Sequence, residues 1–580
     1  MATKSRDRLL LWMGLLLGTA LLLPNHYSPW LSIHQELGVA LAFGPALVWS
    51  VLHVRRIPAL AIAAALLSIV PLLQMAVGQL FFASDGWMAF LYVMGFALAV
   101  YAGARCTERG GPSATAALYP QTWPLTGLLL AAVLSVGIQL YQWLLLGNGG
   151  IYVAELPPHS RPFGNLAQPN QLATLLLMGV AGILFLWEIR KLRISVALAA
   201  ALVLAFGLVM TGSRSVLLTL IWLVPVYGLM RRRCNLRTSP SAVATVIGFY
   251  LLCSFGWASI NAVLMLDIDP NAAVERIAEL GIRKVLWASM LDAIGRAPWR
   301  GYGWGQIGVA QTATALDHPA TYSFFDSSHN LLIDLALWNG LPVAAAVIFV
   351  LVLWFGWQVY QCRDPLSFAL LIAIGVVLSH AMVEYPLNYA YFLLPTGFWM
   401  GVLTAAHPCP LDCSVLPRLR PLLRAMAVAI TAGVLVLFIT VVVEYFPYEA
   451  DWRLMQFQQR RIGNLEHSEP PPAIILTGLR EFMKFSRAEA KPGLSAQDME
   501  QMRRTSERYA YASSMFKYAL AQALNHQGPG AQLTLRRLCK MQTAAACKSA
   551  GREWRELTKN QYPQLTVTPF PPDETQKHGS

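Results

Sequence analysis

Long apolar runs alternate with short polar segments along most of the chain, up to about residue 446. A helix needs about 20 apolar residues to cross the ~30 Å hydrocarbon core of a bilayer, so each run predicts one transmembrane helix. We expect about thirteen spans (12–14), over residues 9–23, 36–54, 57–77, 87–104, 121–146, 166–187, 194–211, 215–230, 242–264, 331–360, 365–382, 389–405 and 425–446. The predicted fold class is an all-α polytopic membrane protein.

The charge of the loops predicts the orientation of these spans. If the amino terminus is cytoplasmic, the cytoplasmic segments hold 18 Lys and Arg residues and the opposite short loops only 7. Basic residues accumulate on the cytoplasmic side, so we expect a cytoplasmic amino terminus and an outer carboxyl terminus. The first apolar run has no small-residue cleavage site before Pro24, and further spans follow it. We therefore interpret it as a retained helix rather than a secretory signal.

The predicted spans divide the chain into two domains. Residues 1–446 form the membrane domain, and residues 447–580 form a polar outer tail. Two outer loops of the membrane domain are long, 147–165 and 265–328. Long loops within a compact architecture are often functional.

The outer tail is predicted to be mostly helical. Ser495 followed by Asp498 resembles a capping box. An apolar stripe at approximately helical spacing follows, formed by Met499, Met502, Tyr509, Ala512, Phe516 and Leu520. A small helical domain that packs its own core explains this pattern better than a cofactor site.

Composition agrees with the membrane assignment and limits the partners. Of the 580 residues 56% are hydrophobic and only 13% charged, fewer than a soluble domain carries. The net charge of +13 reflects cytoplasmic anchoring, and no recognised nucleic-acid module accompanies it. Cys539 and Cys547 both lie in the outer tail, where an oxidising compartment permits a disulfide; two free thiols are the alternative.

The first candidate binding segment lies where the 147–165 loop enters a span. Its sequence, RPFGNLAQPNQ from Arg161 onward, carries the amides Asn165, Gln168 and Asn170. Amides suit sugar hydroxyls, and a guanidinium suits phosphate oxygens in bidentate contact. A capped helix entrance with an interfacial arginine is the alternative.

The second segment is the tight hairpin TGSRS between two spans, with Arg214 at the outer interface. A cation at this depth is costly unless it snorkels or finds an anion, and the following helix amino terminus also favours an anion. The third segment carries Arg283 and Trp287, one turn apart on a predicted helix. The glycine-rich run that follows, 298–306, lacks the Lys-Ser/Thr of a nucleotide loop, so we interpret it as a close-packed turn of glycines and tryptophans.

Two further segments carry histidines. A helix capped by Asp326 or Ser327 would place His329 in its first turn, where the helix dipole favours the neutral imidazole. A neutral imidazole accepts a proton from a hydroxyl, although a capping or interfacial role is the alternative. His380 and Glu384 are four residues apart and so share a helical face, with no third residue to complete a metal site. Glu384 is expected to pair with an arginine or orient a histidine.

Together these segments resemble the O-antigen ligase and polymerase superfamily, and more narrowly its bacterial protein O-oligosaccharyltransferase branch, which modifies pilins and other exported proteins. The resemblance covers nearly the whole chain. Its branch-specific signals are RPFGN with LAQPN, from Arg161, and the His-x-x-x-Glu-Tyr-Pro-Leu stretch from His380. Ala381 replaces the serine more usual after that histidine.

The resemblance implies transfer, without metal or other cofactor, of an oligosaccharide from undecaprenyl diphosphate to an exported, pilin-like acceptor at the periplasmic face of the bacterial inner membrane. By motif, Arg214 and Arg283 should hold the diphosphate, and His329 should activate the acceptor hydroxyl. Arg161 is assigned to the phosphate or the first sugar. The remaining candidates for substrate binding are Asn165, Gln168, Asn170, His380, Glu384 and Tyr385.

Three activities remain open at this point. The first is transfer to a protein, and the second, within the same superfamily, is transfer to lipid A core or to a growing polymer. In either case the chain lacks paired carboxylates to support a covalent intermediate, so transfer is expected to invert the anomeric carbon by direct displacement. A third possibility, an anion transporter, would require polar or broken helices near the bilayer midplane, whereas the candidate groups here gather at one surface.

Overall fold

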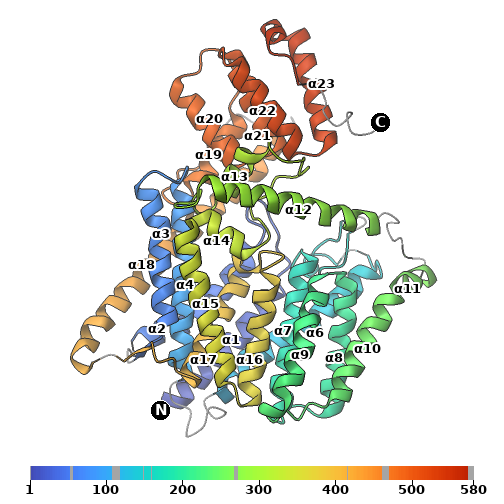
Figure 1. Cartoon of the computed structure of the whole chain (residues 1–580), viewed down its shortest axis with the longest axis vertical. Helices are drawn as coiled ribbons and strands as arrows, with labels where there is room; N and C mark the ends of the chain where they lie inside the picture. The colour runs from blue at the N-terminus through green and yellow to red at the C-terminus, as the bar shows by residue number, and fades with distance from the viewer. Residues whose placement is uncertain are drawn as a thin grey trace. The chain divides into compact units, whose positions relative to one another are not determined.

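The computed structural model confirms an α-helical chain (Figure 1). It describes residues 2–52, 56–107, 118–147, 149–157, 160–264, 266, 272–414, 416–459 and 469–571. Among these residues are 22 α-helices and one two-stranded antiparallel ladder, in which β1 (Arg56–Ile57) pairs with β2 (Cys413–Ser414). The chain divides into two compact units, and each is described by itself.

Unit 1 comprises Met1–Ser68, Leu91–Pro270 and Val347–Leu437. Helices α3, α4, α15 and α18 contribute residues to both units. The helices with residues in unit 1 are α1 (Ala2–Leu21), α2 (Ile33–Val51), α3 (Ala59–Ala76), α4 (Ala83–Thr107), α6 (Thr122–Trp143), α7 (Pro169–Glu188), α8 (Ile194–Thr211), α9 (Ser215–Arg233), α10 (Pro240–Phe255), α11 (Trp257–Val263), α15 (Leu341–Gln361), α16 (Pro365–His380), α17 (Ala390–Ala406) and α18 (Arg420–Gln459).

Eight helices among the described residues are long and apolar enough to cross a membrane, and a ninth span results if the bent pair α10 and α11 counts as one. The bend of that pair is 58° and lies at Gly256, inside the predicted span 242–264. The chain is thus a multi-span membrane protein, whereas the count of thirteen stays a prediction. One boundary was wrong: the predicted span 331–360 contains two helices, α14 (Leu331–Asn339) and α15, separated at Gly340.

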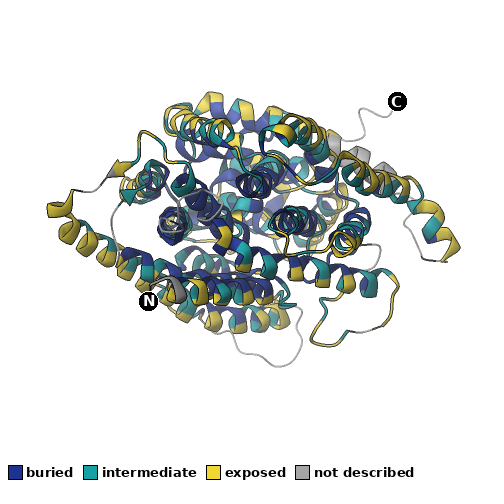
Figure 2. Cartoon of the chain, turned by 90° about the horizontal axis from the view of Figure 1, so that it is seen from below, coloured by how far each residue is buried: buried dark blue, intermediate teal, exposed yellow. Residues whose placement is uncertain are grey.

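Helix α7 is the most enclosed of the candidate spans. It packs against α6, α8 and α16, and 78% of its apolar window is buried, against 11% for α18. In Figure 2 buried positions follow the inward sides of the helices and exposed positions their outward sides. Helices α4 and α17 approach until their backbones touch, since a Cβ atom added at Gly401 would lie 1.8 Å from the carbonyl oxygen of Val100. Small residues at such crossings are typical of membrane helices.

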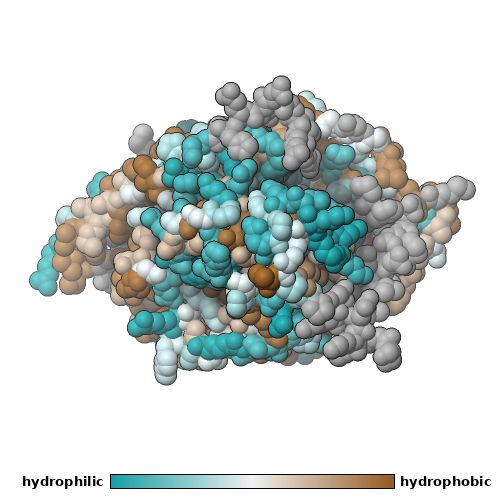
Figure 3. Space-filling view, turned by 90° about the horizontal axis from the view of Figure 1, so that it is seen from above, coloured by the Kyte–Doolittle hydropathy of each residue, from teal (hydrophilic) through white to brown (hydrophobic). Residues whose placement is uncertain are grey.

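Unit 2 comprises Ile69–Phe90, Asn271–Ala346 and Phe438–Ser580. Its helices that lie wholly outside unit 1 are α12 (Ala272–Arg296), α13 (Ile307–Thr314), α14, α19 (Thr477–Arg487), α20 (Ala496–Arg508), α21 (Ala512–Leu524), α22 (Gly528–Met541) and α23 (Ala544–Asn560). Successive helices from α19 to α23 pack on one another. Figure 3 looks onto these C-terminal helices, and the face it presents is largely hydrophilic.

The C-terminal helices confirm the predicted cap and correct the predicted stripe. Ser495 is the N-cap of α20, and its side chain accepts a hydrogen bond from the backbone N–H of Asp498 at 3.1 Å. The chain leaves the helical conformation between Arg508 and Ala512, so the members of the apolar stripe divide between α20 and α21, with Tyr509 as the C-cap of α20. A disulfide joins Cys539 at the end of α22 to Cys547 in α23.

Candidate active site

His329 lies immediately before a helix rather than inside its first turn. Asn330 is the N-cap of α14, and its side-chain oxygen accepts hydrogen bonds from the N–H groups of Leu332 and Ile333. The expectation that Asp326 or Ser327 caps the helix was therefore wrong. His329 itself has a φ of 58°, in the left-handed region that side chains other than glycine rarely adopt. Such strain often accompanies a functional position.

Several contacts hold the backbone around His329. The carboxylate of Asp334, buried in α14, accepts hydrogen bonds from the hydroxyl of Ser327 at 2.7 Å and from the N–H of Ser328 at 2.8 Å. The Ser327 hydroxyl oxygen in turn accepts a bond from the N–H of His329 at 3.1 Å. The ring of Phe325 stands edge-on to the imidazole, with centroids 5.7 Å apart. Burial raises the pKa of the Asp334 carboxyl, which these donors partly offset.

Helix α12 brings Arg283 towards the same loop. The indole N–H of Trp287, one turn after Arg283, donates to the carbonyl oxygen of Ser328 at 2.9 Å. The residue before His329 is therefore bonded to the helix that carries Arg283. Of the predicted residues in unit 2, His329 and Arg283 are thus connected through Trp287, which lies one turn from Arg283.

The glycine-rich run 298–306 is the close-packed turn that its sequence predicts. A Cβ atom at Gly301, where φ is +64°, would lie 2.3 Å from the carbonyl oxygen of Leu337. The rings of Trp304 and Trp338 are stacked with centroids 4.5 Å apart, and the Trp304 indole donates to the side chain of Asn339 at 2.8 Å. The turn thus fixes the end of α14, the helix that follows His329.

In unit 1, Arg161 supports the hairpin that carries Arg214. One Nη atom of Arg161 donates to the carbonyl oxygens of Thr211 and Gly212, each at 3.1 Å. Gly212 ends α8 in the left-handed conformation, and Arg214 is the N-cap residue of α9. Arg161, assigned to the phosphate or the first sugar, therefore hydrogen-bonds to the backbone of the turn that carries Arg214, assigned to the diphosphate.

The amides of the first segment have separate partners. Asn165 is buried: its amide group donates to the carbonyl oxygens of Leu22 and Tyr152, and its oxygen accepts the N–H of Ala154. To bind a sugar, Asn165 would first have to break these bonds. Gln168 is the N-cap of α7. Both side chains thus contribute to the local fold.

Helix α7 is joined to the end of α16 by polar contacts. The amide of Asn170 donates to Glu384 at 2.9 Å, and the hydroxyl of Thr174 contacts Nδ1 of His380. Asn170 is thus a hydrogen-bond partner of Glu384 beyond the arginine or histidine that the sequence suggested. Helix α16 ends at His380, so Glu384 lies in the following turn, and its N–H still bonds to the His380 carbonyl at 2.9 Å.

Tyr385 belongs to an aromatic stack that sequence reasoning only partly found. Its ring stacks on Tyr389 with centroids 6.0 Å apart, and Tyr389 stacks on Tyr391 at 5.1 Å. Beside the stack, the buried carboxylate of Glu36 contacts the hydroxyl of Tyr92 and accepts from the N–H of Ala390 at 3.5 Å. Glu36 is not among the residues that the sequence motifs indicate, although a carboxylate within an apolar run is a signal of function.

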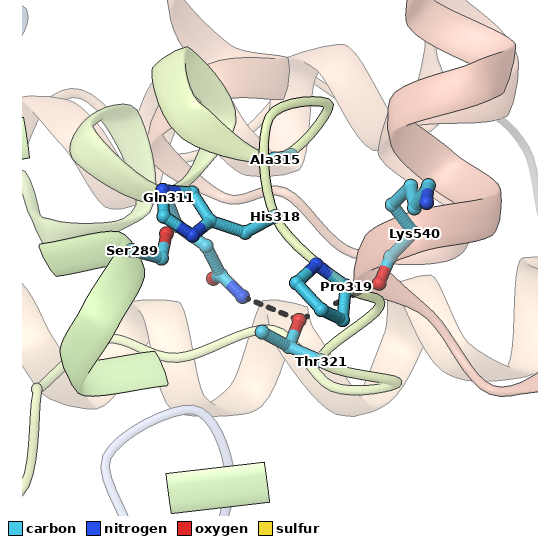
Figure 4. Close-up of a pocket in the computed structure, with 7 residues that line it drawn as sticks. All are labelled: Ser289, Gln311, Ala315, His318, Pro319, Thr321 and Lys540. Atoms are coloured by element: carbon cyan, nitrogen blue, oxygen red, sulfur yellow. Dashed lines mark hydrogen bonds between the residues drawn. The ribbon is translucent and has the colours of Figure 1, made fainter. Parts of the chain in front are cut away.

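A small pocket in unit 2 does not contain any predicted site residue (Figure 4). Within it the side-chain amide of Gln311 donates to the hydroxyl of Thr321 at 3.0 Å, and the N–H of Thr321 donates to the carbonyl oxygen of Lys540 at 2.9 Å. These bonds attach the segment after α13 to α22. The pocket is therefore a joint between two parts of unit 2.

Comparisons with known proteins agree on one kind of enzyme. Three family models match: O-antigen ligase over residues 199–348, protein glycosylation ligase over 162–187, and the C-terminal part of a virulence factor membrane-bound polymerase over 368–551. A general O-oligosaccharyltransferase of Acinetobacter baylyi is 26% identical over 91% of both chains. A ComP-specific O-oligosaccharyltransferase of the same organism is 31% identical over 43% of this chain and 45% of its own. No solved structure matches.

Proposed function

Because the chain belongs to the O-antigen ligase family and is an oligosaccharyltransferase, we propose that it transfers an oligosaccharide en bloc from undecaprenyl diphosphate to Ser or Thr hydroxyls of exported proteins such as pilin. The observation that carries this proposal is the restrained His329 loop. His329 has a strained backbone, and its loop is bonded to the helix that carries Arg283; the imidazole would supply a base and the guanidinium a cation. An oligosaccharyl diphosphate needs both.

In the proposed reaction the acceptor oxygen attacks the anomeric carbon of the first sugar. His329 takes the hydroxyl proton as general base. The bond from that carbon to the diphosphate oxygen breaks, and its electron pair leaves with the diphosphate. Arg214 and Arg283 stabilise the developing negative charge, and Arg161 positions the phosphate or the first sugar. Direct displacement inverts the anomeric configuration, which nuclear magnetic resonance of the product measures.

The proposed reaction takes place at the periplasmic face of the inner membrane. The nine candidate spans become thirteen if the apolar helices α1, α2, α16 and α17 also cross. The charge difference between alternate loops supports a cytoplasmic amino terminus and a periplasmic tail from residue 447. In this topology His329, Arg161, Arg214 and Arg283 all belong to periplasmic segments.

Reconstitution tests the proposal. Purified enzyme in lipid, a lipid-linked oligosaccharide and a candidate pilin should give glycosylated pilin, detected by mass spectrometry. His329→Ala should abolish transfer, whereas the control His318→Ala, in the same unit, should retain it. Arg214→Lys should be impaired because lysine lacks the bidentate fork, with Arg193→Lys at the other end of α8 as its control.

Other products would assign a different function. Glycan on lipid A core or a lengthened polymer, with none on protein, would identify a ligase or a polymerase of the same family. Anion uptake without any transfer would identify a transporter. Near-normal turnover by the His329→Ala enzyme would remove His329 from the reaction.

A further inference from the structure

Helix α23 carries four basic side chains in a line, Lys548, Arg552, Arg555 and Lys559, which we call the basic stripe. All four are exposed. Their spacing of four, three and four residues places them within an arc of about 60° on a helix of 3.6 residues per turn. No ion pair of any of the four is present in the part of the chain that the structure describes, although Glu553 and Glu556 lie on the same helix.

The stripe differs from the arginines of α20, in the same unit. On α20, Arg503 forms ion pairs with Glu500 and Glu507 at 2.7 Å each, and Arg504 pairs with Glu500 at 2.8 Å. Like charges three or four residues apart destabilise a helix, and opposite charges stabilise it. The basic stripe therefore lacks the stabilising ion pairs within the helix that α20 has. An external anion would supply the missing charge.

The stripe is held rigidly. Another face of α23 is buried through Cys547, Ala550 and Trp554. The disulfide from Cys547 fixes the start of the helix to α22, and the indole N–H of Trp554 donates to the carbonyl oxygen of Thr568 at 3.0 Å. A ligand that binds the stripe thus meets cations whose backbone is already ordered, which lowers the entropy cost of binding.

We propose that the basic stripe binds an acidic, extended segment of the acceptor polypeptide, an inference that rests on the proposed transfer to proteins. From Lys548 to Lys559 the helix rises by roughly 16 Å, at 1.5 Å per residue. An extended chain covers that length with about five residues. Carboxylates at alternate positions of such a segment would point to the same side, about 6.5 Å apart, close to the spacing of the cations.

A polypeptide fits the stripe better than a membrane surface. A helix that lies on a membrane presents apolar side chains such as Leu, Phe or Trp beside its cations. On α23 the tryptophan is buried, and the exposed positions are Lys, Arg, Glu, Ser, Asn and Ala. Because α23 has no exposed apolar face to insert into a membrane, it can bind a partner only through its charges. A single row of cations matches one extended acidic segment.

Two acceptor peptides test the inference with full-length enzyme in discs of neutral lipid. They share one glycosylatable Ser, flanked by Asp at alternate positions in one peptide and by Asn in the other. We expect kcat/KM to be about tenfold higher for the Asp peptide at low salt, through KM, and the ratio to fall to about twofold in 0.5 M salt because exposed charges are screened. The variant K548Q/R552Q/R555Q/K559Q should bring the ratio close to one.

Matched variants separate charge from folding. The swap K548R/R552K/R555K/K559R should keep the preference, and E553Q/E556Q should keep or increase it. A neutral-stripe variant that still prefers the Asp peptide, or a wild-type enzyme without preference, overturns the inference. If the neutral-stripe variant loses activity on both peptides equally, and only in discs with phosphatidylglycerol, the stripe binds lipid instead. If wild-type enzyme modifies neither peptide, the proposed function fails. Fluorescence anisotropy of the labelled peptides with the same enzyme then still measures whether the stripe binds the Asp peptide more tightly than the Asn peptide.

Discussion

Replacing Asp334 should disorder the His329 loop without touching the histidine itself. In the Asp334→Ala protein the hydroxyl of Ser327 and the N–H of Ser328 lose an acceptor in a buried place. An unsatisfied buried donor costs about 1–3 kcal/mol. Burial of the carboxylate is itself unfavourable, as its raised pKa indicates, and part of that cost is recovered. The net loss should be about 2–3 kcal/mol.

The two acceptor bonds also predict a graded series. Asn at position 334 keeps an oxygen for the N–H of Ser328 but loses the charge, so Asp334→Asn should cost about 1 kcal/mol. Turnover at saturating donor should fall by roughly a hundredfold in the Ala protein, because a misplaced catalytic group loses orientation, and less in the Asn protein. Thermal unfolding and transfer to acceptor protein measure the two effects.

A half-exposed aspartate of the same unit is the control. Asp292 pairs with Arg296 at 2.7 Å near the surface, where such a pair contributes little, so Asp292→Ala should leave turnover nearly unchanged. If Asp334→Ala unfolds at the wild-type temperature and keeps its turnover, the bonds to Ser327 and Ser328 do not hold the loop. A loss of stability with normal turnover would make Asp334 structural only.

Three further changes test other parts of the fold. Gly401→Ala should destabilise the protein by about 1–3 kcal/mol, because its Cβ would lie 1.8 Å from the Val100 carbonyl oxygen. The yield of folded protein in size-exclusion chromatography should therefore fall. Gly356→Ala, at a position with open space around it, should leave the yield unchanged. C539S/C547S should lose about 2–3 kcal/mol of stability in thermal unfolding, whereas Cys413→Ser, at an exposed free thiol, should match wild type. Burial lowers the pKa of Lys517 from 10.5 to about 8. Between these pH values the unfolded chain holds more protons than the folded chain, so the unfolding temperature should rise with pH across that window. The variant Lys517→Met should show a smaller rise.

The helices of unit 1 could be predicted from apolar runs because a bilayer leaves the backbone few alternatives. Their exact ends depend on competition among caps. Around His329, the residues Asp326, Ser327, Ser328 and Asn330 are all good N-caps. In the structure Asp334 engages Ser327 and Ser328 by hydrogen bonds, and Asn330 caps the helix. The carboxylate of Asp334, one turn after the cap, thus determines which residue caps the helix, and the capping propensities of single residues do not include this effect.

The fate of the amides shows a second limit. Asn165 and Asn170 stand five residues apart in one polar segment, and nothing in that segment separates their roles. Asn165 bonds to the backbone at residues 22 and 152, whereas Asn170 reaches the carboxylate of Glu384. Residue 22 follows the end of α1, residue 152 lies in a loop and Glu384 follows the end of α16, so the assignment depends on which segments neighbour these amides. A single sequence indicates that such side chains need partners, and only the packing says which ones.

His329 combines both limits in one residue. The sequence identifies it through its motif and its place at a predicted helix start, yet an imidazole in the first turn of a helix and one before the cap point in different directions. The left-handed backbone that it adopts costs roughly 1–2 kcal/mol, so the contacts from Ser327 and Asp334 must outweigh that cost. A glycine at position 329 would adopt this backbone conformation without the strain, so the local fold alone does not require a histidine there.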